Sequence, residues 1–183
     1  MRDYIPYGRQ DISQQDIDAV VAALHSDWLT QGPAIAQFES AVASYCGAKY
    51  AVAVSSATAA LHIAAIAAGL GPGDQLWTSP NTFVASANCG LYCGATVDFV
   101  DIDLATYNFS LSALTQKLAQ AAETQTLPKV LIPVHLAGQS CEMAEISALA
   151  QQHDITVIED ASHAIGGCYR DQPVGCCAFS EMT

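Results

Sequence analysis

Polar side chains that can do chemistry directly follow apolar, strand-like stretches of this sequence. Asp160 follows the stretch TVIE and opens the segment DASHAIGG, and His163 comes three residues later. A carboxylate in such an apolar setting needs a partner, because an unpaired buried charge is costly. That partner is either a nearby helix N-terminus or the protonated ring nitrogen of a cofactor, which a carboxylate keeps charged.

Three further strand ends offer groups that can hold a ligand. The segment 55–58 (SSAT) places hydroxyls and backbone N–H groups at a helix start, where a phosphate can bind, although Ser and Thr are also ordinary helix caps. Phe83, in the segment PNTF, is either a core aromatic residue or a flat surface for a bound ring. His135 follows the apolar stretch VLIPV.

The elements that position these residues alternate between strands and helices. Apolar strands alternating with helices predict an α/β fold, with a mostly parallel sheet covered by helices on both faces. Ligands bind beyond the carboxyl ends of the strands in such sheets. The pattern predicts strands at 50–54, 76–79, 96–100, 130–134 and 156–159, and helices at 57–70, 83–93, 111–122 and 143–153.

Two predicted helices precede the first strand. Ser13 can cap the first helix, whose apolar face consists of Ile17, Val20, Val21 and Leu24. The second runs from about Ala34 to near Gly47 and should turn inward Ile35, Phe38, Val42 and Tyr45. We therefore expect an N-terminal helical arm, residues 1–46, and a cofactor-binding large domain, residues 47–183.

Composition argues against several classes of function. The 183 residues carry a formal net charge of −12 and only six Lys and Arg, which disfavours nucleic-acid and anionic membrane surfaces. No secretion signal or membrane-spanning stretch is visible, so a cytoplasmic location is expected. The seven cysteines lack a disulfide framework and the paired spacing of a zinc site, so we interpret them as buried thiols and expect no metal.

Five segments together resemble a known family. In order, they are SSATAALHIA, TSPNTFVASAN, VDIDLATYN, PVHLAGQ and IEDASHAIGG. They resemble the DegT/DnrJ/EryC1/StrS sugar aminotransferases, which have the type I aminotransferase fold, and the resemblance covers nearly the whole chain. GRQDIS, SDWLTQGP and SPNTFVASANCGLYCGA resemble one branch, the UDP-4-amino-4,6-dideoxy-N-acetyl-β-L-altrosamine transaminases of pseudaminic acid biosynthesis.

The resemblance implies pyridoxal 5′-phosphate as the cofactor and a role for each site residue. Ser56, Ala57 and Thr58 would hold its phosphate, and Phe83 would stack on its ring. Asp160 would pair with the ring nitrogen, and His163 would line the same pocket as the candidate catalytic residue.

One departure from the family pattern weakens the implied phosphate site slightly. Ala57 stands where relatives commonly have glycine, so the loop is less free to adopt a positive φ.

The resemblance also implies the reaction and the partners. An amino group would pass from L-glutamate to C4 of a UDP-linked 4-keto-6-deoxy-N-acetylhexosamine, and the whole enzyme would be a homodimer. The segment DWLTQGP would lie near the site, where the nucleotide sugar would meet Trp28, Leu29, Thr30 and Gln31. The same segment is equally well interpreted as an ordinary loop between two helices.

The Schiff-base lysine of this family is missing from the chain. Lys49 precedes the first predicted strand, Lys117 lies within a helix, and Lys129 begins a strand at the wrong end for the pocket. In relatives the lysine follows soon after the segment that corresponds to GCCAFSEMT. We therefore expect an N-terminal fragment that stops before the small C-terminal domain and is inactive alone.

Three alternatives to the aminotransferase share some of these sequence features. A sugar dehydratase of the same family has a histidine in place of the lysine and uses the pyridoxamine form of the cofactor. A remnant or binding module without catalysis would keep the same segments. A nicotinamide dehydrogenase is disfavoured, because GLGPG here follows a helix and precedes a strand, the reverse of a dinucleotide-binding turn.

Overall fold

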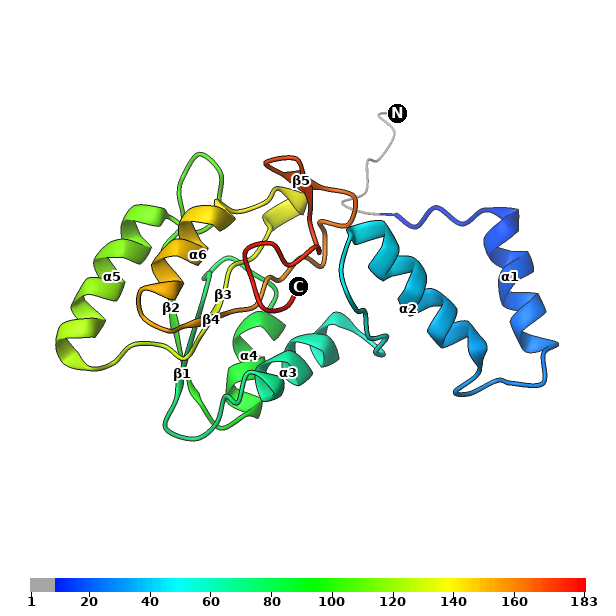
Figure 1. The fold of residues 1–183 in the computed structure, drawn as a ribbon, viewed down its shortest axis with the longest axis horizontal. Helices are drawn as coiled ribbons and strands as arrows, with labels where there is room; N and C mark the ends of the chain where they lie inside the picture. Colours follow the sequence, from blue (N-terminus) through cyan, green and yellow to red (C-terminus); the bar gives the residue numbers. More distant parts are fainter. Residues whose placement is uncertain (1–8) are drawn as a thin grey trace, which may run out of the picture.

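The computed structural model describes residues 9–183; residues 1–8, the start of the predicted arm, lie outside the described residues. The helices are α1 (Gln14–Leu24), α2 (Pro33–Cys46), α3 (Ala57–Ala67), α4 (Ala85–Tyr92), α5 (Leu111–Thr124) and α6 (Met143–Gln151). The strands are β1 (Gln75–Thr78), β2 (Thr96–Phe99), β3 (Val130–Ile132), β4 (Thr156–Val157), β5 (Cys168–Tyr169) and β6 (Gln172–Pro173). Figure 1 shows their arrangement in space.

Four parallel strands form the central sheet in the order β2-β1-β3-β4. Because all four strands run the same way, their carboxyl ends meet at one edge of the sheet. Helices α3 and α4 pack on one face, and α5 and α6 pack on the other. The predicted α/β class, with a parallel sheet covered on both faces, is therefore confirmed.

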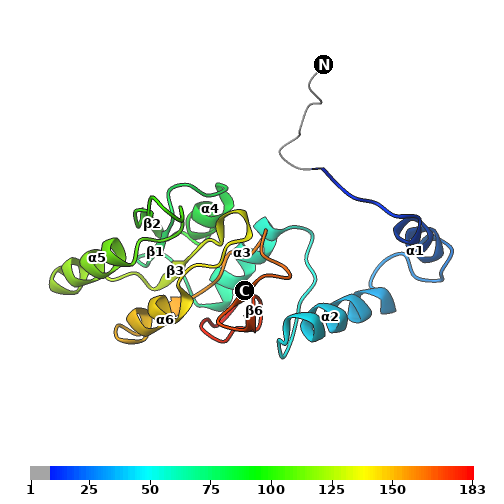
Figure 2. The same cartoon turned by 90° about the horizontal axis from the view of Figure 1, so that it is seen from above.

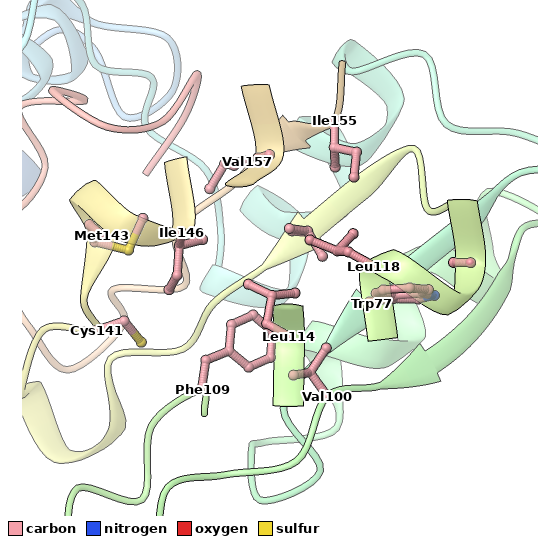
Figure 3. Packing of buried hydrophobic residues seen from close by; sticks show 13 residues of the cluster. Trp77, Val100, Phe109, Leu114, Leu118, Cys141, Met143, Ile146, Ile155 and Val157 are labelled. Carbon is pink, nitrogen blue, oxygen red and sulfur yellow. The ribbon is translucent and has the colours of Figure 1, made fainter. Parts of the chain in front are cut away.

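Alternation along each strand divides the core into two clusters. Trp77, Leu131 and Val157 face α5 and α6, where they pack with Leu114 and Leu118 (Figure 3). The neighbouring strand residues face α3 and α4, in a second cluster that includes Leu61, Leu76, Ala85, Cys89, Val130, Ile132 and Ile158. Burying each large aliphatic side chain contributes about 1.5–3 kcal/mol, so these clusters stabilise the sheet that carries the site.

The strand predicted at 50–54 is wrong. This segment is extended but forms no strand, and Tyr50 and Val52 are both 76% exposed. Its Ala53 N–H donates to Glu39 Oε1 at 2.8 Å, a side-chain acceptor rather than a neighbouring strand. An apolar run has the sequence of a strand, but it forms a strand only where a neighbouring sheet edge offers backbone N–H and C=O groups to pair with.

The other predicted elements are present with different bounds. Strands β3 and β4 are shorter than predicted, although parallel pairing continues beyond them in a bridge between Val134 and Asp160. Helix α4 begins at Ala85 rather than at residue 83, because residues 81–84 form bends and a turn instead. Helix α5 extends to Thr124, two residues further than expected.

Helices α1 and α2 extend to one side of the sheet domain (Figures 1 and 2). Ser13 caps α1 in a reciprocal capping box with Asp16, and α2 ends at Gly47 in the left-handed conformation, as predicted. The expectation that the apolar residues of α2 face inward is wrong for Ile35, Phe38 and Tyr45. No residue of α1 is buried, and the exposed residues of both helices include Ile17, Val20, Val21, Leu24, Ile35, Phe38 and Tyr45.

The last residues of the chain return to the sheet. Met182 forms a parallel bridge with Ile158, and the Glu159 N–H donates to the Met182 carbonyl oxygen at 2.8 Å. The antiparallel β5–β6 hairpin precedes this segment, and Tyr169 in β5 donates to Glu145 on α6 at 2.9 Å. The C-terminal segment therefore packs beside β4, near the carboxyl edge of the sheet.

No helix in the described part of the chain is long and apolar enough to span a membrane.

Candidate cofactor site

Asp160 lies at the carboxyl edge of the sheet, immediately beyond β4. Its backbone N–H donates to the Pro133 carbonyl at 2.9 Å, and its own carbonyl accepts from the His135 N–H at 3.0 Å. These two bonds continue the pairing of β3 with β4 by one step. The sheet itself, rather than a flexible loop, therefore fixes the backbone of Asp160.

Hydroxyl groups hold both oxygens of the Asp160 carboxylate. Ser86 Oγ on α4 donates to Oδ2 at 2.6 Å, and Ser162 Oγ donates to Oδ1 at 2.6 Å. The Ser162 N–H also points at Oδ1, at 3.3 Å. The side chain is only 7% exposed, so these bonds replace most of its water.

A cationic partner for Asp160 is not present among residues 9–183. The ion pairs of the described chain involve Asp74, Asp98, Glu145 and Glu159, and none includes Asp160. The nearby Cys89 thiol stays neutral, because burial, together with the Asp160 carboxylate, raises the pKa of Cys89 to about 12. A buried carboxylate bonded only by neutral donors fits a ligand that brings its own positive charge, such as a protonated ring nitrogen.

The predicted phosphate cradle forms the first turn of α3. Ser56 is the N-cap residue, and its Oγ accepts from the Ala59 N–H at 3.2 Å. The N–H groups of Ala57 and Thr58 precede the first intrahelical bond, so they have no acceptor within the helix. Both the free donors and the helix dipole favour an anion at this position.

The structure removes the concern raised by Ala57. This residue is the first of α3 and does not adopt a positive φ. Alanine is therefore compatible with the cradle without backbone strain, and glycine is not required there.

Phe83 lies exposed in the loop before α4. It lies two residues before α4 and is 73% exposed, which excludes the alternative of a core aromatic residue. Two hydrogen bonds hold the loop that carries Phe83. Asn81 Nδ2 donates to the Tyr107 carbonyl at 3.0 Å, and Thr82 Oγ1 shares a 2.9 Å hydrogen bond with Ser86 Oγ.

His163 follows Asp160 in a turn rather than in a helix, and its side chain is exposed. Its backbone is confined by the loop after β3, because a Cβ on Gly138 would lie 2.7 Å from the His163 carbonyl oxygen. Gly138 also has a φ of +90°, so only glycine fits there without strain. His163 therefore lies at the same edge as Asp160, but no hydrogen bond joins their side chains.

The structure does not bring residues 28–31 to this edge. They lie in the turn between α1 and α2, at the end of the arm that is distant from the sheet (Figures 1 and 2). Trp28 and Leu29 are exposed, and Gln31 adopts a left-handed backbone conformation. Their role in binding a sugar stays a prediction.

The three lysines lie elsewhere, as the sequence predicted. Lys117 on α5 pairs with Asp98 at 2.7 Å, and Lys129 pairs with Asp74 at 3.0 Å at the amino end of the strands. Lys49 lies over the Tyr50 ring at 5.2 Å.

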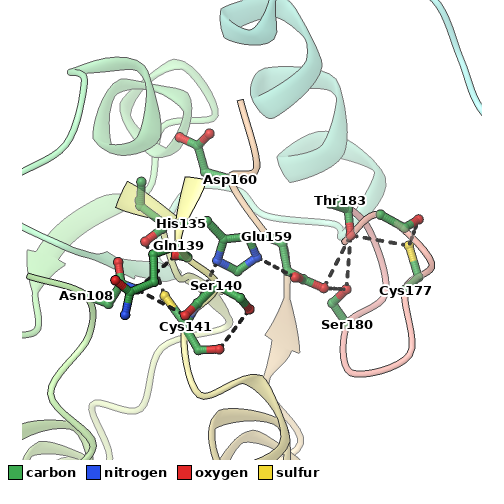
Figure 4. A network of polar contacts seen from close by, with 12 residues as sticks. Asn108, His135, Gln139, Ser140, Cys141, Glu159, Asp160, Cys177, Ser180 and Thr183 are labelled. Carbon is green, nitrogen blue, oxygen red and sulfur yellow. Dashed lines mark hydrogen bonds and ion pairs between the residues drawn. The ribbon is translucent and has the colours of Figure 1, made fainter. Parts of the chain in front are cut away.

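Sequence reasoning missed a second buried carboxylate, Glu159, and its polar network (Figure 4). His135 Nε2 and Glu159 Oε2 are 2.7 Å apart, and His135 Nδ1 accepts from the Cys141 N–H at 3.2 Å. With Nδ1 as the acceptor, Nε2 carries the proton and donates to Glu159. Ser180 Oγ also donates to Glu159, so the network ties the C-terminal segment to the sheet.

A signal for this network was present in the sequence. Side chains alternate along a strand, so Glu159 and Asp160 must point to opposite faces. His135 directly follows the apolar stretch 130–134 of the neighbouring strand. There it can meet Glu159, the carboxylate on its own face of the sheet.

Comparison with known proteins identifies the family. The model of the DegT/DnrJ/EryC1/StrS aminotransferase family matches residues 10–182. The chain belongs to this family. Among curated relatives of the family, the spore coat polysaccharide biosynthesis protein SpsC of Bacillus subtilis (strain 168) is 44% identical over 172 residues, which cover 94% of this chain and 43% of SpsC.

Solved structures of the family agree with the fold. Spr1654 from Streptococcus pneumoniae, in its PMP form, has a TM-score of 0.86 at 30% identity and is matched over 97% of this chain and 46% of its own. Helicobacter pylori PseC, an aminotransferase of pseudaminic acid biosynthesis, has a TM-score of 0.85 at 31% identity, over 93% of this chain and 44% of its own. The chain thus spans under half the length of these relatives.

The cofactor expectation is confirmed at the level of the family. Spr1654 has been solved in both PLP and PMP forms, the two forms between which pyridoxal phosphate cycles when it carries an amino group. The residues of this chain that would hold the cofactor remain a proposal.

Proposed function

We propose that this chain forms the cofactor-binding part of a pyridoxal-phosphate-dependent aminotransferase that acts on a nucleotide sugar. The observation that carries the proposal is Asp160, a buried carboxylate with hydroxyl donors and no cation among the described residues. Its position beyond β4 is where ligands bind in parallel α/β sheets. Membership of the aminotransferase family supports the same function.

Each candidate residue would perform one task. The bound cofactor would supply an electron-accepting ring through which an amino group passes from L-glutamate to a keto sugar. Asp160 would accept the ring N–H and keep that nitrogen protonated, and residues 56–58 would anchor the phosphate. Phe83 would cover one face of the ring, and His163 would hold or move a proton at the edge of the site.

The proposed acceptor is C4 of a UDP-4-keto-6-deoxy-N-acetylhexosamine, as in pseudaminic acid biosynthesis. Likeness to PseC and the branch-like segments of the sequence support this choice. Residues 28–31 are the proposed sugar contacts. We also propose a cytoplasmic homodimer, in keeping with seven free cysteines in the structure.

A sugar dehydratase of the same family is the second candidate, and a binding module without catalysis is the third. The three lysines of this chain do not separate the two enzymes, because the position that distinguishes them follows the segment that corresponds to GCCAFSEMT in relatives. The whole protein, given L-glutamate and the keto sugar, should release 2-oxoglutarate if it is an aminotransferase. A dehydratase would add no nitrogen to the sugar, which mass spectrometry of the sugar product distinguishes.

Ligand binding to the 183-residue chain tests the proposed cofactor site. Pyridoxamine 5′-phosphate, titrated while its fluorescence is followed, should bind saturably. Pyridoxamine without the phosphate should bind at least about 10-fold more weakly, because it loses the charge-assisted bonds to the start of α3. Absence of saturable binding by the phosphorylated compound, or equal affinity for both compounds, would contradict the proposed site.

A further inference from the structure

Among residues 9–183, Ser86 is the one group that joins the Asp160 carboxylate to helix α4. Its side chain is fully buried, and its Oγ lies 2.6 Å from Asp160 Oδ2, although the two residues are 74 positions apart in the sequence. Ser162, which bonds the other oxygen, is exposed and only two residues from Asp160. The bond from Ser162 is therefore local, whereas the bond from Ser86 fixes the carboxylate relative to a different element.

The hydrogen-bond direction at Ser86 follows from the number of its hydrogens. A serine hydroxyl has one proton to donate. The bond to a charged carboxylate at 2.6 Å is stronger than the alternative contact with the neutral Phe83 carbonyl at 3.3 Å. With its proton given to Asp160, Ser86 must accept in its 2.9 Å hydrogen bond with Thr82 Oγ1. The direction is thus Thr82 to Ser86 to Asp160.

This chain of hydroxyls connects the two sides of the proposed ring site. Thr82 directly precedes Phe83, the proposed stacking residue, and Ser86 lies in the first turn of α4. A shift of the loop that carries Phe83 would therefore move Thr82, and through Ser86 it would turn the plane of the Asp160 carboxylate. Ser86 and Ser162 each donate to one oxygen of the Asp160 carboxylate. These two bonds fix the plane of the carboxylate, and so the directions in which its oxygens can accept a further hydrogen bond.

We infer that Ser86 is a positioning residue, which fixes the Asp160 carboxylate in the orientation that accepts the cofactor ring N–H and couples it, through Thr82, to Phe83. This inference rests on the proposed function, because it requires the ring to bind between Phe83 and Asp160. Ser86 itself touches neither the ring nor the sugar. Its effect passes entirely through Asp160.

The test compares variants that separate hydrogen bonding from packing. Ser86→Ala removes the hydroxyl, and Ser86→Cys keeps nearly the same volume but offers only a weak donor. Thr82→Val removes the first hydroxyl of the chain at a half-buried position. Ser162→Ala is the matched control, because it removes the other, local hydroxyl from the same carboxylate.

Two readouts are needed: the dissociation constant for pyridoxamine 5′-phosphate, and the ¹⁵N chemical shift of its labelled ring nitrogen when bound. We expect Ser86→Ala and Ser86→Cys each to weaken binding about 10-fold, the lower end of the effect of one lost hydrogen bond to a charged group. Both should also shift the ring-nitrogen signal toward that of the unprotonated ring. Thr82→Val should produce a smaller change in the same direction, and Ser162→Ala a smaller effect than Ser86→Ala.

The possible results distinguish this inference from the proposed function. If the unaltered chain does not bind pyridoxamine 5′-phosphate, the proposed function fails. If it binds but Ser86→Cys behaves like the unaltered chain, the role of Ser86 is packing, and the inference is overturned. An unchanged ring-nitrogen shift in both Ser86 variants would overturn it equally. Should Ser86→Ala fail to fold, Ser86→Cys and Thr82→Val decide the question.

Discussion

Two adjacent carboxylates at the end of β4 occupy opposite sides of the sheet, and their surroundings differ. Glu159 lies on the α6 side, where it pairs with His135 and accepts from Ser180. Asp160 lies on the α4 side, where only serine hydroxyls and one backbone N–H donate to it. Among the described residues, Glu159 therefore has a ring N–H donor in His135, whereas Asp160 has no ring N–H donor.

This difference separates a structural role from a binding role. A buried charge with an internal partner contributes to holding the fold, and losing that partner is costly. A buried charge without one lowers the stability of the ligand-free protein, and the ligand can recover that cost. The two carboxylates should therefore respond in opposite ways to mutation.

The largest expected effect is on the Glu159 side. His135→Ala leaves Glu159 buried without its partner and should lower the free energy of unfolding by about 3 kcal/mol. Urea denaturation followed by circular dichroism measures this. His153→Ala, at a half-buried position just beyond α6, is the control and should cost much less. Equal losses in the two variants would mean that the pair with Glu159 has no special importance.

The next effect is on the Asp160 side and has the opposite character. Asp160→Asn keeps the shape but removes the charge that pairs with a ring nitrogen, so binding of pyridoxamine 5′-phosphate should weaken about 10- to 100-fold. The free energy of unfolding of the ligand-free chain should stay the same or rise, because an unpaired buried charge is removed. A variant that loses stability but keeps its affinity would reverse the roles assigned to the two sides.

The sheet and the positions of the two carboxylates could be predicted from the sequence, but the contacts that each carboxylate makes could not. The parallel sheet and the position of Asp160 follow from apolar runs that end in polar residues. The bond between Ser86 and Asp160 depends on how α4 packs against the sheet, which local patterns do not determine. For the same reason the strand at 50–54 was wrong: periodicity cannot tell whether a sheet edge is free beside it.

The inward face expected for α2 was wrong for a related reason. The apolar spacing of Ile17 and Leu24, or of Ile35 and Phe38, correctly predicts a helix with one apolar side. It does not specify what covers that side. In this chain these residues are exposed, so the pattern identified the helices but not their packing.

A smaller effect is expected at Phe83, on the ligand side of the comparison. Phe83→Ala should weaken binding of pyridoxamine 5′-phosphate about 3- to 10-fold, because a stacked aromatic pair contributes about 0.5–1.5 kcal/mol. Unfolding should be nearly unchanged, since the ring is already 73% exposed. Tyr50→Ala is the matched control, at an aromatic residue of similar exposure to which no contact with the site is assigned, and should leave the affinity unaltered. Equal weakening in both variants would argue against stacking at Phe83.

The smallest expected effect concerns two buried thiols, one on each side. Burial is the main cause that raises the pKa of Cys89, beside Asp160, and of Cys141, beside Glu159, to about 12. At pH 8 only about one thiol in ten thousand would be ionised, so both should resist iodoacetamide while the exposed Cys168 reacts.

His135→Ala removes the acceptor of the Cys141 N–H and should loosen that side alone. Cys141 should then be alkylated a few-fold faster, which peptide mass spectrometry measures. Cys89 should stay protected, because the hydrogen bond from Ser86 on α4 to Asp160 is intact. If both thiols became equally reactive, the loss of His135 would be opening the whole sheet domain. In that case the two sides of the sheet would open as one unit. They would then differ in the partners of their carboxylates but not in their local stability.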